Sequence, residues 1–198
     1  MRVMVADTWP GSRAAPGVAE AWQQAVQAPW GLLEVDPRPS EAQLRTLWRQ
    51  MVAWEGEKAP LLVVPGSLAD PLGPGQTWAD LAAAWGFKVL LTLPEEAALS
   101  QAAAFAALLR QTKADCLGWV LLEAAPALSS RLEPALVWQL PAQVGIPVLG
   151  RKAVAGSVVW REELWDLYAG MGGLPRASPP LIGAHQLRLG EDVAFHGP

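Results

Sequence analysis

The hydrophobic pattern of the chain alternates between short apolar runs and longer segments with helical spacing. Residues 59–94 show it most clearly, because two apolar runs, LLVV and VLLTL, flank one short helical segment. Continuous apolar runs are typical of strands covered on both faces, and a short helix between two of them predicts a parallel βαβ unit. The loop after Val64 then lies at the carboxyl end of its strand, where open α/β sheets bind ligands.

The same alternation extends along most of the chain. Strands are expected at residues 2–6, 31–35, 61–64, 89–93, 117–122 and 146–149, and helices at 17–27, from Ser40, from Thr77, at 100–113 and from Ser130. Ser40 with Gln43 forms a capping box, and Asp80 stands at the third position after Thr77. This order predicts an α/β fold in three layers, with a mostly parallel sheet and helices on both faces.

Several side chains are assigned to the core by their spacing. Leu44, Leu47, Trp48 and Met51 share one helical face, and the helix at 100–113 is expected to bury Phe105, Leu108 and Leu109. Trp22, Trp48 and Trp85 also fall at core spacing, whereas Trp9 and several other tryptophans are candidates for either packing or protein contact. Cys116 lies within an apolar run and is expected to be a small core residue.

Beyond Arg151 the pattern weakens, which divides the chain into an α/β domain at residues 1–155 and a C-terminal extension at 156–198. Residues 158–168 could hold the end of a strand and a helix, and residues 170–180 are rich in glycine and proline. The last eighteen residues read as an irregular arm. Because this arm retains leucine, valine and phenylalanine, we expect it to pack on the domain or on a partner.

Composition and charge restrict the classes of partner. A formal net charge of −4 without a basic run gives no reason to expect nucleic acid. No apolar run approaches the roughly 18 residues of a membrane span. The chain opens directly with a strand and has a single cysteine, which cannot form an internal disulfide. A cytoplasmic location is therefore the expectation.

The segments between residues 60 and 154 resemble a known family. The run LLVVPGSLADPL followed by TWADLAAAWGFKVLLTL, the run CLGWVLLEAAP and the run GIPVLGRKAV are similar to the dethiobiotin synthetases, ATP-dependent carboxylase-ligases of the P-loop class. In the second run, Gly118, Trp119 and Val120 match the core of the family's adenine-side strand. The resemblance implies a P-loop NTPase architecture, an ATP and magnesium site, and a homodimer.

The residues of the implied nucleotide site are largely missing. A phosphate loop needs several glycines, a lysine and a Ser/Thr that holds magnesium, but the first loop reads DTWPGSRAAP with Gly11 as its only glycine. Ala14 and Ala15 stand where the resemblance places the lysine and threonine. Pro65 replaces the magnesium-binding glutamate, and Leu122 the asparagine that reads adenine. The family's second-strand lysine has no counterpart either, since Glu34, Asp36 and Arg38 stand there instead.

Three hypotheses remain open. The first is a catalytically degenerate protein that acts through protein contacts as a scaffold or regulatory subunit and needs no cofactor. The second is an enzyme that uses ATP and magnesium through a rebuilt cleft, and the third is a non-catalytic binder of a small anionic metabolite at the same edge. The cleft candidates are Asp7, Thr8, Gly11, Ser12, Arg13, Ser67 and Asp70.

Other polar clusters have simpler interpretations. His185 and His196 match no metal motif, and no catalytic residue is assigned. Glu95 and Glu96 are expected to begin a helix, where negative charge suits the helix dipole. Arg151, Lys152 and Arg161 form a small basic cluster, for which surface solubility is favoured over anion binding.

Overall fold

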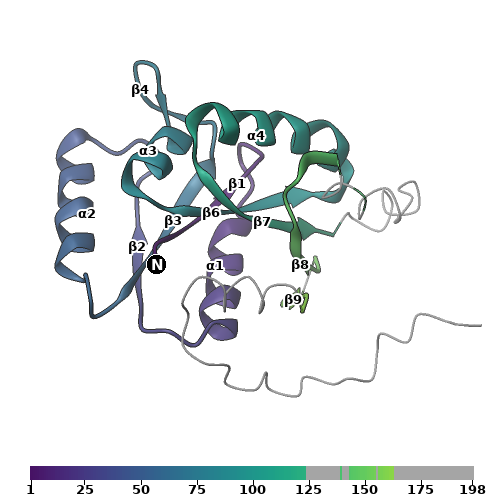
Figure 1. The fold of residues 1–198 in the computed structure, drawn as a ribbon, viewed down its shortest axis with the longest axis horizontal. Coiled ribbons are helices and arrows are strands. Elements are labelled where there is room, and N and C mark those ends of the chain that lie inside the picture. The colour runs from purple at the N-terminus through teal and green to yellow at the C-terminus, as the bar shows by residue number, and fades with distance from the viewer. Residues whose placement is uncertain (124–138, 140–142, 155, 163–198) are drawn as a thin grey trace, which may run out of the picture.

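The computed structural model describes residues 1–123, 139, 143–154 and 156–162, and these residues build one mixed sheet with helices on both sides (Figure 1). The strands are β1 (Val3–Asp7), β2 (Trp30–Glu34), β3 (Ala59–Ser67), β6 (Lys88–Pro94), β7 (Asp115–Leu122), β8 (Val148–Lys152) and β9 (Val158–Trp160). The helices are α1 (Ala14–Ala25), α2 (Glu41–Ala53), α3 (Trp78–Trp85) and α4 (Ala98–Thr112). The helix expected from Ser130 and the arm after residue 162 lie outside the described residues.

The sheet has the strand order β2-β3-β1-β6-β7-β8-β9. All neighbouring pairs are parallel except β8 and β9, which are antiparallel. The chain builds outward from β1 to β2, returns to β3 beside β1, and then continues on the other side of β1 with β6. The direction of winding therefore reverses at β1, and the carboxyl ends of β1, β3 and β6 form the switch point where such sheets bind ligands.

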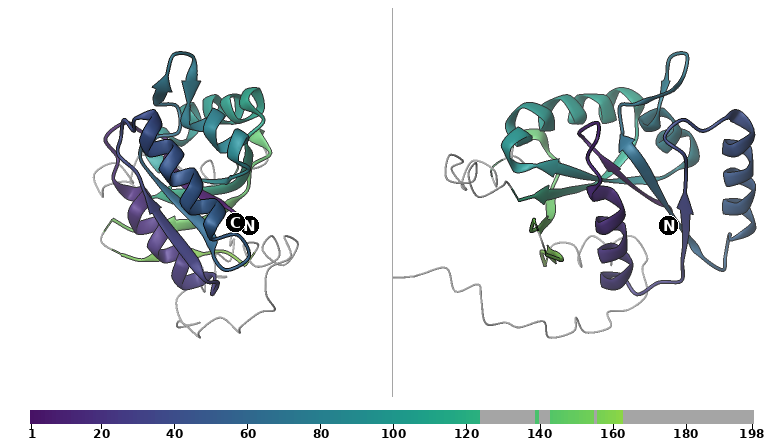
Figure 2. Two further views of the ribbon diagram at one scale, coloured as in Figure 1. Left: turned by 90° about the vertical axis from the view of Figure 1, so that its left-hand side faces the viewer. Right: turned by 180° about the vertical axis from the view of Figure 1, so that it is seen from behind.

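Two hydrophobic cores lie on the two faces of the sheet. Figures 1 and 2 show α1 on one face and α3 and α4 on the other, while α2 stands beside the edge strand β2. Along β1, Val3 and Val5 face α1, whereas Met4 and Ala6 face α3 and α4. Strands buried on both faces explain the continuous apolar runs of the sequence, and the predicted three-layer α/β fold class is confirmed.

The first helix differs from its prediction at both ends. It was expected at residues 17–27, but α1 begins at Ala14 and ends at Ala25. Pro16 therefore lies inside the first turn and not in the preceding loop. A proline is tolerated there, because the first N–H groups of a helix have no partner within the helix. Since Arg13 provides no side-chain cap, the sequence holds no local signal for this start.

Two other helices begin where the sequence places them. Ser40 and Gln43 form the predicted capping box of α2, and Thr77 and Asp80 form the equivalent box of α3. The loop before α3 also holds a short hairpin of β4 (Pro71–Gly73) and β5 (Gln76–Thr77) that the sequence pattern did not predict. A three-residue 3₁₀ turn, η1 (Glu95–Ala97), precedes α4.

Some predicted boundaries and core assignments are wrong. Strand β3 extends from Ala59 to Ser67, and the strand expected at 146–149 is shifted to Val148–Lys152. On α2 Met51 is buried and Leu44 and Leu47 are half-buried against the core, because this helix flanks an edge strand rather than the centre of the sheet. Trp48 is 37% exposed and packs against Trp85, with ring centroids 5.2 Å apart.

Other core assignments hold. Trp22 is fully buried, Phe105 and Leu109 are buried, and Cys116 is half-buried against the core on the α3 and α4 side. The sheet itself continues to Trp160, in the segment where the end of a strand was considered. Of the helices in the residues described, none has the length and apolar character that crossing a bilayer requires.

Candidate functional site at the carboxyl ends of the central strands

Three buried polar residues form a row across the switch point. Asp7 ends β1 and is paired in register with Ser67 of β3 on one side and with Thr92 of β6 on the other. Their residual exposures are 1%, 2% and 0%. Asp7 follows Val3 and Val5 along the strand, so its carboxylate occupies a position on the α1 face where the two preceding residues belong to the core.

Asp7 is held by both the neighbouring strand and the first helix. The Thr92 hydroxyl donates a hydrogen bond to Asp7 Oδ1. The Ser12 hydroxyl and the backbone N–H groups of Ala14 and Ala15 also favour the charged carboxylate. Among the described residues Oδ2 has no partner of ordinary hydrogen-bond geometry, so these contacts are weakly aligned. Burial outweighs them and raises the pKa of Asp7 above the ordinary aspartate value of 3.8.

This arrangement places a carboxylate at the N-terminus of α1. The first turn of a helix carries unpaired N–H groups and partial positive charge, which attract phosphates and carboxylates alike. In α1 the N-cap residue, Arg13, makes no side-chain cap bond, and the nearest negative charge comes instead from the end of β1. An incoming phosphate would therefore meet a carboxylate at the position where a nucleotide-binding turn offers free amides.

Thr8, Ser67 and Asp70 are engaged in bonds within the protein. Thr8 Oγ1 donates to Gln101 Oε1 at 2.9 Å, and Ser67 Oγ donates to the Thr8 carbonyl at 3.4 Å. Asp70 turns back on its own loop, where its Oδ2 accepts a 2.9 Å bond from the Ser67 amide. The polar groups of this loop thus fix the turn after β3 rather than point toward solvent.

Gly11, Ser12 and Arg13 form the turn before α1. The Ser12 amide donates to the Trp9 carbonyl at 3.1 Å, and Gly11 closes the turn with φ of +89°, a conformation that favours glycine. The Ser12 hydroxyl accepts a weak 3.4 Å bond from the Ala14 amide. Arg13 is exposed, as is Trp9 at 54%. Asp7, Thr8, Ser12 and Ser67 are therefore brought together, Asp70 is bonded to the Ser67 amide, and Gly11 and Arg13 are exposed.

The positions matched to the nucleotide site carry no polar side chain in the structure. Ala15 is buried against the α1 side of the sheet, Pro65 is exposed at the end of β3, and Leu122 ends β7. Within the described ranges, no group of three or more His, Cys, Asp and Glu residues is placed to hold a metal ion.

Two features of this edge were missed in the sequence. Thr92 interrupts the apolar run VLLTL, and such a polar residue inside a buried strand is a usable signal that a partner faces it. Arg151 forms an ion pair with the buried Glu95 at 2.6 and 3.2 Å and a longer one with Glu123 at 3.5 Å. Its side chain is partly exposed, as the surface interpretation expects, but it also joins the ends of β6, β7 and β8. These contacts raise the pKa of Arg151.

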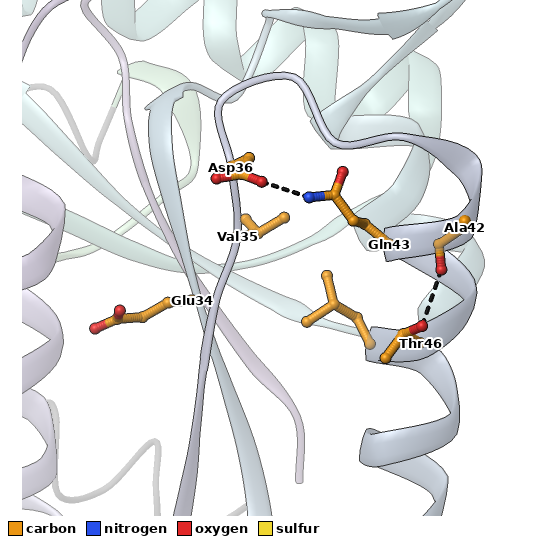
Figure 3. A pocket seen from close by; sticks show the side chains of 7 residues that line it. Glu34, Val35, Asp36, Ala42, Gln43 and Thr46 are labelled. Atoms are coloured by element: carbon orange, nitrogen blue, oxygen red, sulfur yellow. Dashed lines mark hydrogen bonds between the residues drawn. The ribbon is translucent and has the colours of Figure 1, made fainter.

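A cavity of about 480 Å³ lies between the end of β2 and α2 (Figure 3). It is lined by Glu34, Val35, Asp36, Ala42, Gln43, Thr46 and Leu47. Asp36 accepts a hydrogen bond from the Gln43 side chain across it. Its charged lining groups are both carboxylates, which makes this cavity unfavourable for an anion.

The chain is similar to one enzyme family. Over 124 residues it is 33% identical to the ATP-dependent dethiobiotin synthetase BioD of Synechocystis sp.. The aligned part is 60% of this chain and 51% of that protein, so the chain spans about half the length of the relative it matches. No family model matches the chain. The similarity and the mostly parallel α/β sheet support a dethiobiotin synthetase-like relationship and a P-loop NTPase-like architecture.

Proposed function

We propose that this chain is a catalytically degenerate dethiobiotin synthetase-like protein that acts through protein contacts, as a scaffold or regulatory subunit. The observation that carries the proposal is the Asp7 carboxylate, buried at the N-terminus of α1 and bonded to Thr92. A turn that already faces an internal carboxylate, and that offers no lysine or threonine at positions 14 and 15, is poorly suited to polyphosphate.

Exposed apolar residues on α2 support the second half of the proposal. Trp48 and Val52 of α2 are exposed, and Arg2 lies 5.5 Å from the centre of the Trp48 ring. Tryptophan and arginine are the residue types that dominate the binding energy of many protein interfaces. The α2 surface around Trp48 is therefore the contact surface that we favour, with either a second copy of the chain or another protein.

The alternatives are an ATP-dependent ligase of the dethiobiotin synthetase type and a binder of a small anionic metabolite. Both need a cationic or amide-rich cleft at the carboxyl ends of the strands. Arg151 is engaged by Glu95 and Glu123, and the Asp7 carboxylate adds negative charge at the switch point. These contacts favour the degenerate protein over both alternatives.

Nucleotide titration tests the proposal directly. Isothermal titration calorimetry of the full chain with ATP and magnesium chloride should show no saturable binding below the millimolar range. Saturable binding with turnover of ATP would overturn the proposal. The matched variants are Ala14→Lys with Ala15→Thr, once with Asp7 retained and once with Asp7→Gly. If the carboxylate blocks the turn, any gain in ATP affinity should require the Asp7→Gly change.

Light scattering tests the contact surface. After size-exclusion chromatography, the full chain should show a mass above that of the monomer or should bind a protein partner. Trp48→Ala should weaken that association, and Glu57→Ala, an exposed change near the end of α2, should not. A chain that is monomeric and binds no partner would contradict the role in protein contacts.

A further inference from the structure

The α1 face of the edge strand β2 carries an apolar groove. A cavity of about 540 Å³ lies there between α1, β2 and β3. Buried Ala19 and Val63 form its floor, and Leu32, which is 42% exposed, forms its wall on β2. Parallel sheets are usually covered by helices on both faces, so a further helix in this groove would complete the layer that α1 begins (Figure 2).

The rim of the groove is acidic. Glu20 of α1 and Glu34 of β2 line it, and no Lys or Arg of the described residues does. Both glutamates are exposed, and Glu34 forms no ion pair within the described part of the chain. A helix that combines exposed apolar side chains with positive charge would therefore suit the groove, since it would cover Leu32 and neutralise the rim.

Helix α2 of the same chain has this chemistry on its outer surface. Trp48 and Val52 lie four positions apart and are 37% and 42% exposed. Arg45 and Arg49, also four apart, form the adjoining stripe of the helix, and with Trp48 they line a cavity of about 370 Å³. Arg45 is bonded to Glu41 at 2.6 Å, whereas Arg49 forms no ion pair with any described residue.

The groove and α2 lie on opposite faces of the sheet of one chain. Met51 of α2 belongs to the core on the α3 and α4 side, whereas the groove opens on the α1 side, and both elements flank the edge strand β2 (Figure 1). A two-fold rotation about an axis parallel to β2 exchanges the two faces. It would bring α2 of each copy beside the groove of the other, so that two identical contacts form at once.

We propose that two copies of this chain associate reciprocally, with α2 of each copy seated in the β2 groove of the other. Trp48 then packs against Leu32 of the other copy, and Arg49 pairs with Glu34. The inference rests on the proposed function, because it names the partner of the α2 contact surface. Both sets of residues are described, and their charges and exposed apolar groups are complementary.

A charge exchange between two chains tests the pairing. Glu34→Arg alone and Arg49→Glu alone should each weaken self-association at least about tenfold in light scattering, because each places like charges in both contacts. An equimolar mixture of the two variants should associate as the unaltered chain does, since both contacts then join opposite charges. Glu57→Arg and Arg110→Glu are the matched controls, because these residues are exposed and line neither cavity. A mixture as weak as the separate variants would overturn the proposal.

The apolar half of the contact is tested by Leu32→Ser. This change should weaken self-association at least about tenfold. It should leave the free energy of unfolding of the monomer nearly unchanged, because Leu32 is partly exposed. Unaltered association would overturn the proposal.

The failure of this inference is distinguishable from that of the proposed function. A monomeric chain that captures another protein through Trp48 would retain the proposed function and overturn the reciprocal contact. Saturable ATP binding with turnover would overturn the proposed function but would leave the result of the mixing experiment unchanged.

Discussion

The N-termini of α1 and α3 show two ways of stabilising the start of a helix. In α3 the cap is local, since Thr77 and Asp80 bond to each other's backbone within four residues. In α1 the preceding residue, Arg13, provides no cap, and the negative charge comes from Asp7 at the end of a strand. The local cap lies at the surface, whereas Asp7 is buried. Replacing a local cap should change the stability of its own helix only. Asp7 instead contacts the start of α1 and lies beside both β3 and β6, so replacing it should affect three elements at once.

The largest effect is expected from Asp7→Ala. This change removes the acceptor of the Thr92 hydroxyl and the polar group at the first turn of α1, and it leaves a small cavity. We expect the free energy of unfolding to fall by about 3 kcal/mol. Urea unfolding followed by tryptophan fluorescence measures it, with the exposed Glu57→Ala as control. If the loss in unfolding free energy equals that of the control, the contacts of Asp7 with β6 and α1 do not stabilise the protein.

A smaller loss is expected from Arg151→Met, which keeps the apolar stem but removes the guanidinium. Like Asp7 before α1, Glu95 is a carboxylate that precedes a helix without a side-chain cap. It lies in η1, and α4 follows η1 directly. Losing the charged hydrogen bonds to this buried group should cost about 2 kcal/mol. Adding Glu95→Gln should recover part of the loss in a double-mutant cycle. Strictly additive losses would mean that the two residues do not interact.

A local cap should matter less. Thr77→Ala removes the hydroxyl that accepts from the Asp80 amide and donates to the Asp80 carboxylate. We expect a loss of about 1 kcal/mol in the same unfolding measurement, the usual value for a cap residue. A loss as large as that of Asp7→Ala would remove the distinction between the two helix starts.

The smallest effect concerns how the free energy of unfolding depends on pH. The contributions of Asp7 and Asp80 should change with pH in opposite directions. Burial raises the pKa of Asp7 above 3.8, so its contribution to stability is fully present below 3.8 and is lost as the pH rises through the raised value. Hydrogen bonds from Thr77 lower the pKa of Asp80, so its contribution is present above 3.8 and is lost as the pH falls through the lowered value.

Unfolding free energies of the Asn variants measure this contrast. As the pH falls from neutral toward 3, the difference between the unaltered chain and Asp7→Asn should grow, and the difference from Asp80→Asn should shrink. Asp36→Asn serves as a reference for a carboxylate at the surface. If the two differences in unfolding free energy changed in the same direction with pH, Asp7 would not be dominated by burial or Asp80 would not be dominated by its hydrogen bonds.

The same contrast explains what the sequence could predict. The starts of α2 and α3 were predictable, because Ser40, Gln43, Thr77 and Asp80 act within one turn. The start of α1 was placed three residues late, because its anion comes from Asp7, which belongs to another element. The bond between Asp7 and Thr92 spans 85 positions and exists only once β1 and β6 are paired. The parallel α/β architecture follows from the alternation of elements, but the strand order and the ion pairs at the edge of the sheet do not.

The central place of β1 has a consequence for the synthesis of the protein. Its two neighbours, β3 and β6, are made long after it, so Val3, Met4 and Val5 leave the ribosome without the strands that later cover them. Such long-range pairing is slow, and an apolar strand awaiting its partners is prone to aggregate. Strand β1 is therefore the part of the described sheet that would depend most on chaperones.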